Sequence, residues 1–282
     1  MVGQCRVGKR CSVRLRCESS RFCYIVGMPA NGRAVGYRTA RHPTRRARAR
    51  LIAVLACALF ARPAKLAAQI TVPGASALEP TRIRYGTFEY VLSILRDGEE
   101  QIVGSITDEI LPLRGDEPVI RRVQTTKRSG GPYIDSTATD AETMAPRWHH
   151  SIQPPRNILL RFGGARVQGT IASTKAATRT VDLTLSDLAF DASNFDLAIR
   201  ALPLEEGEAD VIQVYDVDRN VHRYSLRVAD RELRGKSALI HITVHLTSDI
   251  DAHMWFDDVT RTLLRIETPI GPGVLLKQVL KP

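Results

Sequence analysis

The sequence predicts a mostly β fold, built as one domain of antiparallel strands. Short runs rich in β-branched and aromatic residues follow one another from residue 82 onward, and turn residues separate them at regular intervals. Between the runs we find no long segment with a 3.6-residue apolar period, which the helices of a parallel βαβ sheet would need. No Gly/Ser-rich linker and no internal repeat interrupts them. We therefore expect one domain at 82–282, with 69–81 as an N-terminal extension.

The first half of this domain contains seven predicted strands. The run 83–95 ends at Arg96-Asp97-Gly98, a typical signal of a tight β-hairpin. Gly163-Gly164 is also interpreted as a hairpin turn, because no Lys-Ser/Thr pair follows to make a phosphate loop. The predicted strands are 83–95, 101–111, 119–127, 133–138, 158–162, 166–173 and 178–185.

One short helix and six further strands complete the domain. Asp191 and Asn194 are good capping residues, the segment 195–199 supplies an apolar face, and Pro203 ends the pattern. We expect a helix of two or three turns. The strands predicted after it are 209–217, 222–229, 238–247, 253–256, 262–268 and 274–280.

The positive charge of the chain lies outside the predicted domain. Residues 1–68 contain 15 Lys and Arg against one acid, whereas residues 69–282 contain 25 Lys and Arg against 29 acids. A nucleic-acid-binding protein carries its positive charge on the folded domain, where it neutralises phosphates. We therefore do not expect a nucleic-acid partner.

Residues 28–68 have the composition of a secretory signal peptide. A basic block at 44–50 precedes an apolar run at 51–61, and small residues lead to Ala68, after which we place the cleavage. The apolar run is shorter than the roughly 20 residues of a membrane-spanning helix. Three alternatives stay open: a buried helix of the mature protein, a twin-arginine signal, and a lipid anchor on Cys57. We predict export, to the periplasm, with membrane contact only through the leader or transiently.

All five cysteines lie before residue 69, so residues 69–282 contain none. Four of them recur every six residues before Met28, a spacing that matches no zinc motif. We interpret 1–27 as an over-extended reading frame that begins before the true start at Met28; a metal-binding arm is the alternative. A chain without cysteine depends on its core for stability, and about 210 residues are enough to bury one.

Catalytic motifs are missing from the sequence. We find no G-x-S-x-G, no H-E-x-x-H and no EF-hand loop, and we predict no catalytic residue, no metal and no cofactor. His241 and His245 share one face of a predicted strand, with His253 a turn away. The Cβ atoms of His241 and His245 are roughly 13 Å apart along the strand, too far for both side chains to bind one metal ion. A polar face of the sheet is the simpler interpretation. A non-enzyme is expected, and a hydrolase with an unrecognised site is the alternative.

Several short motifs resemble a family of secreted bacterial β proteins of unknown function. This family is related in fold to the periplasmic outer-membrane lipoprotein carriers and to lipid-binding half-barrels. The resemblance spans about residues 85–280 and implies a single strongly curved antiparallel sheet or incomplete β-barrel, with the short helix near its mouth. The motifs are D-x2-T-M-x-P at 140–146 and on to His149, F-x3-R-V-x-G at 162–169, F-D at 190–191, A-L-P-L at 201–204, M-W-F-D at 254–257, Thr260-Arg261 and Leu264-Arg265.

This architecture suggests a binding function. A half-barrel with an apolar concave face can hold an acyl chain. We therefore predict a non-enzymatic periplasmic binding or carrier protein for a lipid or a lipidated protein. A structural or interaction protein of the envelope, with a solid core and no small ligand, is the alternative. The predicted cavity lining is Trp148, Phe195, Leu197, Ile199 and Trp255, for which ordinary core packing is the alternative.

Overall fold

The computed structural model describes residues 70–207, 209–234 and 237–282. All of them belong to the compact unit Pro63–Pro282. The predicted segment 1–27, the leader at 28–68 and its cleavage site after Ala68 lie outside the described residues.

Sixteen strands of the described chain join in one sheet that does not close into a barrel. The hydrogen-bonded order runs from β1 and β11 through β16 to β2 and on to β9, with β10 paired to β11. The bounds are β1 Ile70–Thr71, β2 Gly86–Arg96, β3 Glu99–Leu113, β4 Val119–Arg128, β5 Gly131–Asp140, β6 Pro146–Gln153, β7 Arg156–Gly163, β8 Arg166–Ser173, β9 Arg179–Thr184, β10 Phe190–Asp191, β11 Ala209–Asp216, β12 Asn220–Arg234, β13 Ser237–Thr247, β14 Ile250–Asp257, β15 Leu263–Gly271 and β16 Val274–Leu280.

The predicted fold class is confirmed. Neighbouring strands pair antiparallel, apart from the two-residue strands β1 and β10, which run parallel to β11. The predicted β2–β3 hairpin is present, with Arg96 opposite Glu99. Asp97 and Gly98 have φ values of 52° and 85°, as a type I′ turn requires. The β7–β8 hairpin turns at Gly164, which also has a positive φ.

The prediction missed β6 and shortened several strands. β6 contains Trp148, His149 and His150, and its polar residues hide the alternation of a strand. In the folded molecule this alternation is real, because His149 and Ser151 are buried while their neighbours are less so. The burial comes from the partner strands β5 and β7, which lie on either side.

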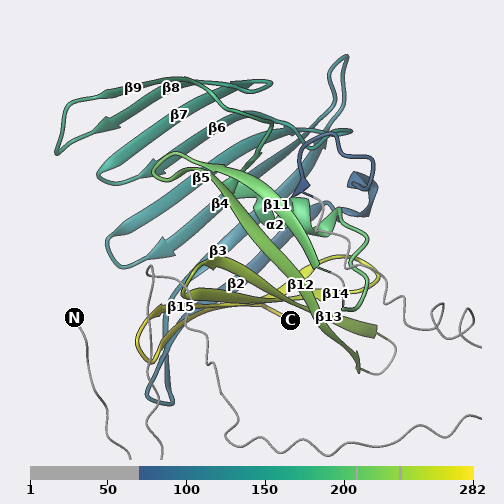
Figure 1. Ribbon diagram of the computed structural model, residues 1–282. Coiled ribbons are helices and arrows are strands. Elements are labelled where there is room, and N and C mark those ends of the chain that lie inside the picture. Colours follow the sequence, from purple (N-terminus) through teal and green to yellow (C-terminus); the bar gives the residue numbers. More distant parts are fainter. Residues whose placement is uncertain (1–69, 208, 235–236) are drawn as a thin grey trace, which may run out of the picture. The chain divides into compact units, whose positions relative to one another are not determined.

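The predicted helix forms at the expected place but is short. A 3-10 turn η2 (Ala192–Asn194) leads into α2 (Phe195–Arg200), and the Asp191 side chain accepts a hydrogen bond from the Ser193 N–H at 3.0 Å. A second 3-10 turn, η1 (Pro80–Arg82), precedes β2. In Figure 1, α2 lies between β11 and the strands β4 and β5, and hydrogen bonds from Arg122 on β4 and Thr137 on β5 to η2 and α2 agree with this position.

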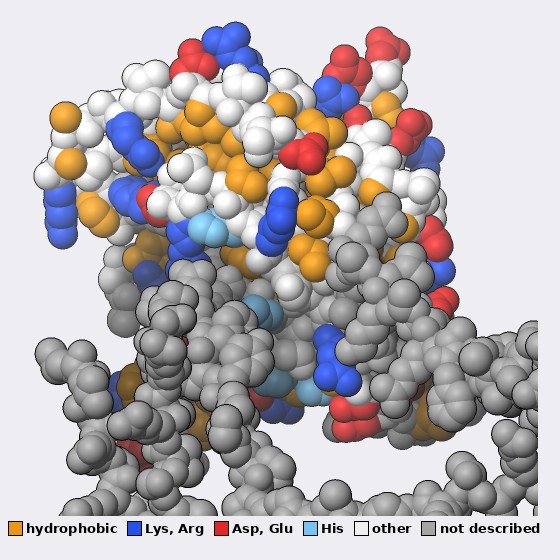
Figure 2. All heavy atoms as spheres, viewed as in Figure 1, with side chains coloured by type: hydrophobic (Ala, Val, Ile, Leu, Met, Phe, Trp, Pro, Cys, Tyr) orange, Lys and Arg blue, Asp and Glu red, His pale blue; other side chains and the backbone are white. Residues whose placement is uncertain are grey.

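Two hydrophobic clusters fill the inner side of the sheet. The larger one packs Leu197 and Ile199 of α2 against inward side chains of β2–β4 and β11–β14. The smaller one covers β7–β9 with the segment 185–189 and with Tyr215 of β11. Leu197 and Ile199 are fully buried, so the space around α2 is filled by the chain itself. Figure 2 shows further hydrophobic side chains at the surface, in the upper part of the molecule.

Candidate functional site

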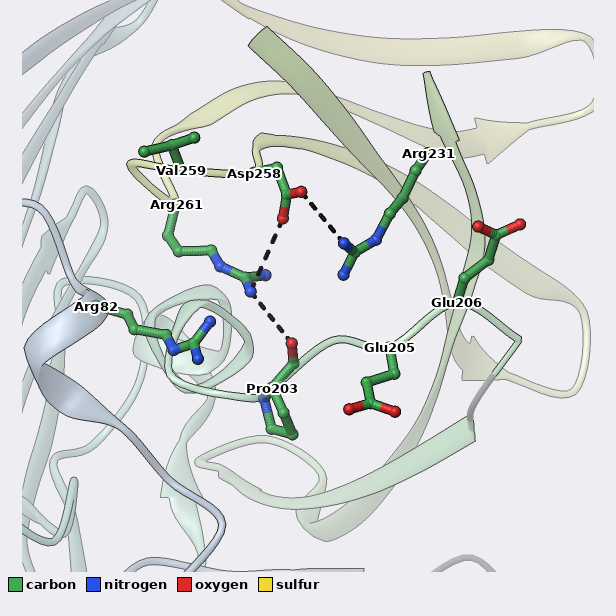
Figure 3. A pocket seen from close by; sticks show the side chains of 8 residues that line it. All are labelled: Arg82, Pro203, Glu205, Glu206, Arg231, Asp258, Val259 and Arg261. Carbon is green, nitrogen blue, oxygen red and sulfur yellow. Dashed lines mark hydrogen bonds and ion pairs between the residues drawn. The ribbon is translucent and has the colours of Figure 1, made fainter. Parts of the chain in front are cut away.

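A hollow lined by charged side chains lies beside the end of α2, and we call it the arginine pocket (Figure 3). Its volume is about 510 Å³, and it opens to solvent. Four parts of the chain meet there: η1, the segment that follows α2, β12 and the β14–β15 turn. The lining residues are Arg82, Pro203, Glu205, Glu206, Arg231, Asp258, Val259 and Arg261.

Local turn chemistry positions the innermost arginine of the pocket. The Asp257 carboxylate accepts hydrogen bonds from the N–H groups of Val259 (3.1 Å) and Thr260 (2.7 Å), so it closes the β14–β15 turn. Arg261 follows with a φ of 53°, a conformation that is uncommon for a residue with a side chain. The turn thereby directs the Arg261 side chain under the segment that leaves α2, where its Nη2 donates to the Pro203 carbonyl at 3.1 Å.

The other two arginines have carboxylate partners. Arg231 donates to Asp258 at 3.2 Å and to the Leu204 carbonyl at 2.5 Å. Arg82 donates to Glu79 at 2.5 Å. Arg261 lies 4.0 Å from the nearer Asp258 oxygen, and burial together with the neighbouring Arg82 lowers the pKa of Arg261. Three guanidinium groups therefore converge in the pocket, whose lining also includes three carboxylates, those of Glu205, Glu206 and Asp258.

A second polar cluster lies inside the sheet and holds α2 in place. Arg122 of β4 binds Asp108 through two hydrogen bonds of 2.8 and 2.7 Å and reaches Asp196 of α2 at 2.6 Å. Arg200 completes the chain with a 2.7 Å bond to Asp196. All four side chains are buried. The two ion pairs of Arg122 join α2 to β3 and β4, while Nε and Nη1 of Arg200 have no hydrogen-bond partner within the described residues.

His149 lies next to a serine and two aspartates, an arrangement that invites comparison with a hydrolase site. Its Nδ1 is 3.1 Å from Asp191, and its Nε2 is 3.4 Å from the Ser193 hydroxyl and 3.5 Å from Asp135. Burial lowers the pKa of His149, but the Asp191 and Asp135 carboxylates outweigh it and raise this pKa to about 10. An imidazolium near pH 7 has no lone pair to accept the serine proton. The geometry favours an ion pair that positions η2.

The histidines of the outer face do come together in part. His241 Nε2 is 3.0 Å from His253 Nδ1, and His241 stacks on Trp255 at 4.5 Å between ring centroids. His245 instead contacts Asp251 at 2.6 Å. Within the described residues, no group of three or more His, Cys, Asp or Glu side chains is placed to hold a metal ion.

The five predicted lining residues do not share one cavity. Leu197 and Ile199 are fully buried in the larger hydrophobic cluster, and Phe195 packs edge-on against Tyr224 beside it. Trp255 lies on the opposite face of the sheet from its buried neighbours Met254 and Phe256. Trp148 lies on the face opposite His149, half-buried between β5 and β7.

The arginine pocket has almost no signature in the sequence. Thr260-Arg261 enters the sequence motifs only as part of a hairpin, and no motif includes Arg82, Arg231 or Asp258. The one local signal is Asp257 three residues before Thr260, which indicates a tight turn. That an arginine after this turn is buried depends on contacts between segments far apart in the chain.

Comparison with known proteins places the fold in a family. The family model described as "Protein of unknown function (DUF3108)" matches residues 89–278. The chain belongs to the DUF3108 family. This membership confirms the resemblance to an uncharacterised bacterial β family that the sequence motifs indicated. No curated protein matches the sequence of this DUF3108 chain.

Two solved structures resemble this DUF3108 chain weakly. A "putative lipoprotein" from Parabacteroides distasonis ATCC 8503 is 11% identical with a TM-score of 0.23, and the match covers 75% of this chain and 98% of that one. A "putative thioesterase II" from Thermobifida fusca YX is 12% identical with a TM-score of 0.15, covering 68% and 78%. At these TM-scores neither similarity bears on function. Among the described residues, no helix has the length and apolar character needed to cross a membrane.

Proposed function

We propose that this chain is an exported, non-enzymatic binding or carrier protein of the cell envelope, acting in the periplasm on a lipid or a lipidated protein. The observation that carries the proposal is the arginine pocket, a solvent-open hollow of about 510 Å³ beside the end of the short helix. This volume is in the range of small-molecule sites. Because α2 fills the inner side of the sheet, the ligand is bound at this surface hollow instead of deep in the half-barrel.

Two further observations support binding without catalysis. The His149 imidazolium, held between carboxylates, is unsuited to act as a general base near neutral pH because its pKa is raised to about 10. The charged residues around α2 are used in mutual ion pairs that anchor the helix. Export rests on the signal-peptide pattern of residues 28–68.

Native mass spectrometry of the full chain, produced with its leader and recovered from the cell envelope, tests this function. We expect a lipid-sized adduct that is lost on denaturation, and lipid extraction of the same preparation then identifies its class. A mass without adduct and an extract without lipid would contradict the lipid-binding proposal.

A second function, an envelope protein that acts through protein contacts alone, is favoured by the filled interior and by one edge of the sheet. Among the described strands, β9 pairs only with β8, so its other edge has free backbone groups. An exposed edge of this kind can add a strand from a partner. An adduct-free protein that is recovered in a stable complex would favour this function.

A further inference from the structure

Arg261 is a buried cation with unused hydrogen-bonding capacity. Its side chain is only 3% exposed, and Nη2 donates to the Pro203 carbonyl. Its Nε and Nη1 have no hydrogen-bond partner in the part of the chain that the structure describes. Buried polar groups are normally satisfied, and an unsatisfied charged one costs more than a neutral one. The floor of the arginine pocket is therefore suited to an additional acceptor.

The charges around Arg261 reinforce this conclusion. Arg82 and Arg231 are about one-third exposed and approach the same hollow from η1 and β12, as Figure 3 shows. Asp258 lies within 4.0 Å of both Arg231 and Arg261, so a single carboxylate is shared between two guanidinium groups. Burial and the repulsion from Arg82 lower the pKa of Arg261, and the Asp258 and Glu79 carboxylates offset this only in part, so a bound anion would further stabilise its charged form.

The backbone holds this arrangement in an uncommon conformation at two points. Arg261 has a φ of 53°, and Leu204, whose carbonyl accepts from Arg231, has a φ of 55°. Positive φ at residues with side chains is disfavoured and tends to occur at functional sites. The pocket is built from strained backbone on both of its sides.

We propose that the arginine pocket binds a phosphate group, with Arg82 and Arg231 as direct ligands and Arg261 as the buried charge at its floor. The three guanidinium groups approach from different elements, and a tetrahedral phosphate has oxygens that can accept from several directions, whereas a carboxylate is planar. The volume of about 510 Å³ leaves space for an organic group attached to the phosphate. This inference rests on the proposed binding function and names the chemistry that the pocket recognises.

The phosphate can belong to a phospholipid headgroup or to a soluble phosphate ester. Glu205 and Glu206 line the solvent side of the pocket and are exposed, so water screens their repulsion of an anion. Their side chains supply a test of sign: removal of one of these charges strengthens phosphate binding, whereas removal of an arginine weakens it.

Isothermal titration of the full chain with sn-glycerol 3-phosphate, and sedimentation with phosphatidylglycerol vesicles, separate the two sources. We expect binding in at least one arm, a loss of about tenfold in affinity for Arg82→Gln and for Arg261→Gln, and a gain for Glu205→Gln. Arg265→Gln, which removes an arginine paired with Glu267 on the outer face, is the matched control and changes affinity by less than about twofold. All variants keep the basic leader, so comparison with Arg265→Gln also corrects for attraction between this leader and the vesicles.

The outcomes separate this inference from the proposed function. Binding in neither arm, or equal affinities for wild type, Arg82→Gln and Arg261→Gln, would overturn the phosphate site. Equally tight binding of succinate would overturn the choice of phosphate over carboxylate. If Arg261→Gln fails to fold, the partly exposed Arg82 decides the question. Binding of glycerol phosphate by a protein that carries no lipid supports the phosphate site and contradicts the lipid function, whereas a lipid adduct unaffected by Arg82→Gln does the reverse.

Discussion

At the scale of single residues, buried charges determine how the short helix is held. Four charged side chains are buried beside the helix and neutralise one another, so the removal of any one would leave an uncompensated charge. They are Asp108, Arg122, Asp196 and Arg200. His149 extends the same principle to β6, because it is ionised between two carboxylates. These side chains connect α2 and η2 to β3, β4 and β6.

The ionised state of His149 makes a pH-dependent contribution to stability. Its folded pKa of about 10 lies above the value of about 6.5 in an unfolded chain. The stabilisation is therefore complete below about pH 6.5 and is lost as the pH rises through about 10. His149→Gln should reduce the free energy of unfolding by about 3 kcal/mol at pH 6, and the difference from wild type should shrink by about pH 9.5.

Urea denaturation at both pH values, followed by circular dichroism, measures this difference. His150→Gln is the control, since this neighbour on the opposite face contacts the Asn157 side chain at 3.0 Å in an exposed position and should change stability little at either pH. A constant difference across the pH range would argue that His149 is neutral in the folded protein.

At the scale of elements, close approach of backbones decides which residue a strand accepts. Gly169 in β8 faces the Leu159 carbonyl of β7, and a Cβ there would lie 1.9 Å from that oxygen. A Cβ on Gly163, at the end of β7, would meet no atom of the described chain within 4 Å. The two glycines of this hairpin thus have different roles: Gly169 leaves space for the neighbouring strand, whereas Gly163 ends β7 at a position where a side chain would have room.

Alanine substitutions should separate these two roles. Gly169→Ala forces β7 and β8 apart and should lower the free energy of unfolding by about 1–3 kcal/mol. Gly163→Ala should change it by less than about 0.5 kcal/mol. Thermal unfolding of both variants measures the contrast, and equal midpoints would show that the hairpin adjusts to the extra methyl group.

At the scale of the whole described unit, β16 lies between two groups of strands in the sheet. One group is β2–β9, from the first part of the domain, and the other is β11–β15, from the second part. β16 pairs with β15 on one side and with β2 on the other, so the strands β11–β15 connect to β2–β9 through it in the order of the sheet. The larger hydrophobic cluster draws on both groups, for example Tyr90 and Ile110 from one and Ile240 and Met254 from the other. The two groups are expected to be stable only together.

Removal of residues 272–282 should therefore abolish cooperative folding. Without β16, the long edges of β2 and β15 are exposed and the shared cluster loses its connection. Differential scanning calorimetry should show no cooperative transition for this truncation, whereas removal of Pro282 alone should leave the wild-type transition. A truncated chain that still unfolds cooperatively would show that the two groups fold independently.

Local patterns in the sequence were sufficient to predict the fold class, the position of the short helix and most strands, because these depend on alternation and turn residues. The Asp97-Gly98 turn and the Asp191 cap are local in this sense, and the structure has both, while the turn predicted at Gly163-Gly164 lies one residue later, at Gly164-Ala165. The family resemblance was likewise carried by short motifs.

Which charges are buried, and which side chains share a site, depends instead on tertiary contacts. β6 was hidden because its polar residues are buried by neighbouring strands, and Asp196 and Arg200 look like an exposed helical pair until the sheet encloses them. The five predicted lining residues lie on different faces of the sheet, because tertiary packing decides which face of each strand is buried. The arginine pocket is formed by η1, the segment after α2, β12 and the β14–β15 turn, which are up to about 180 residues apart in the chain. No local sequence pattern predicts that such distant segments come into contact.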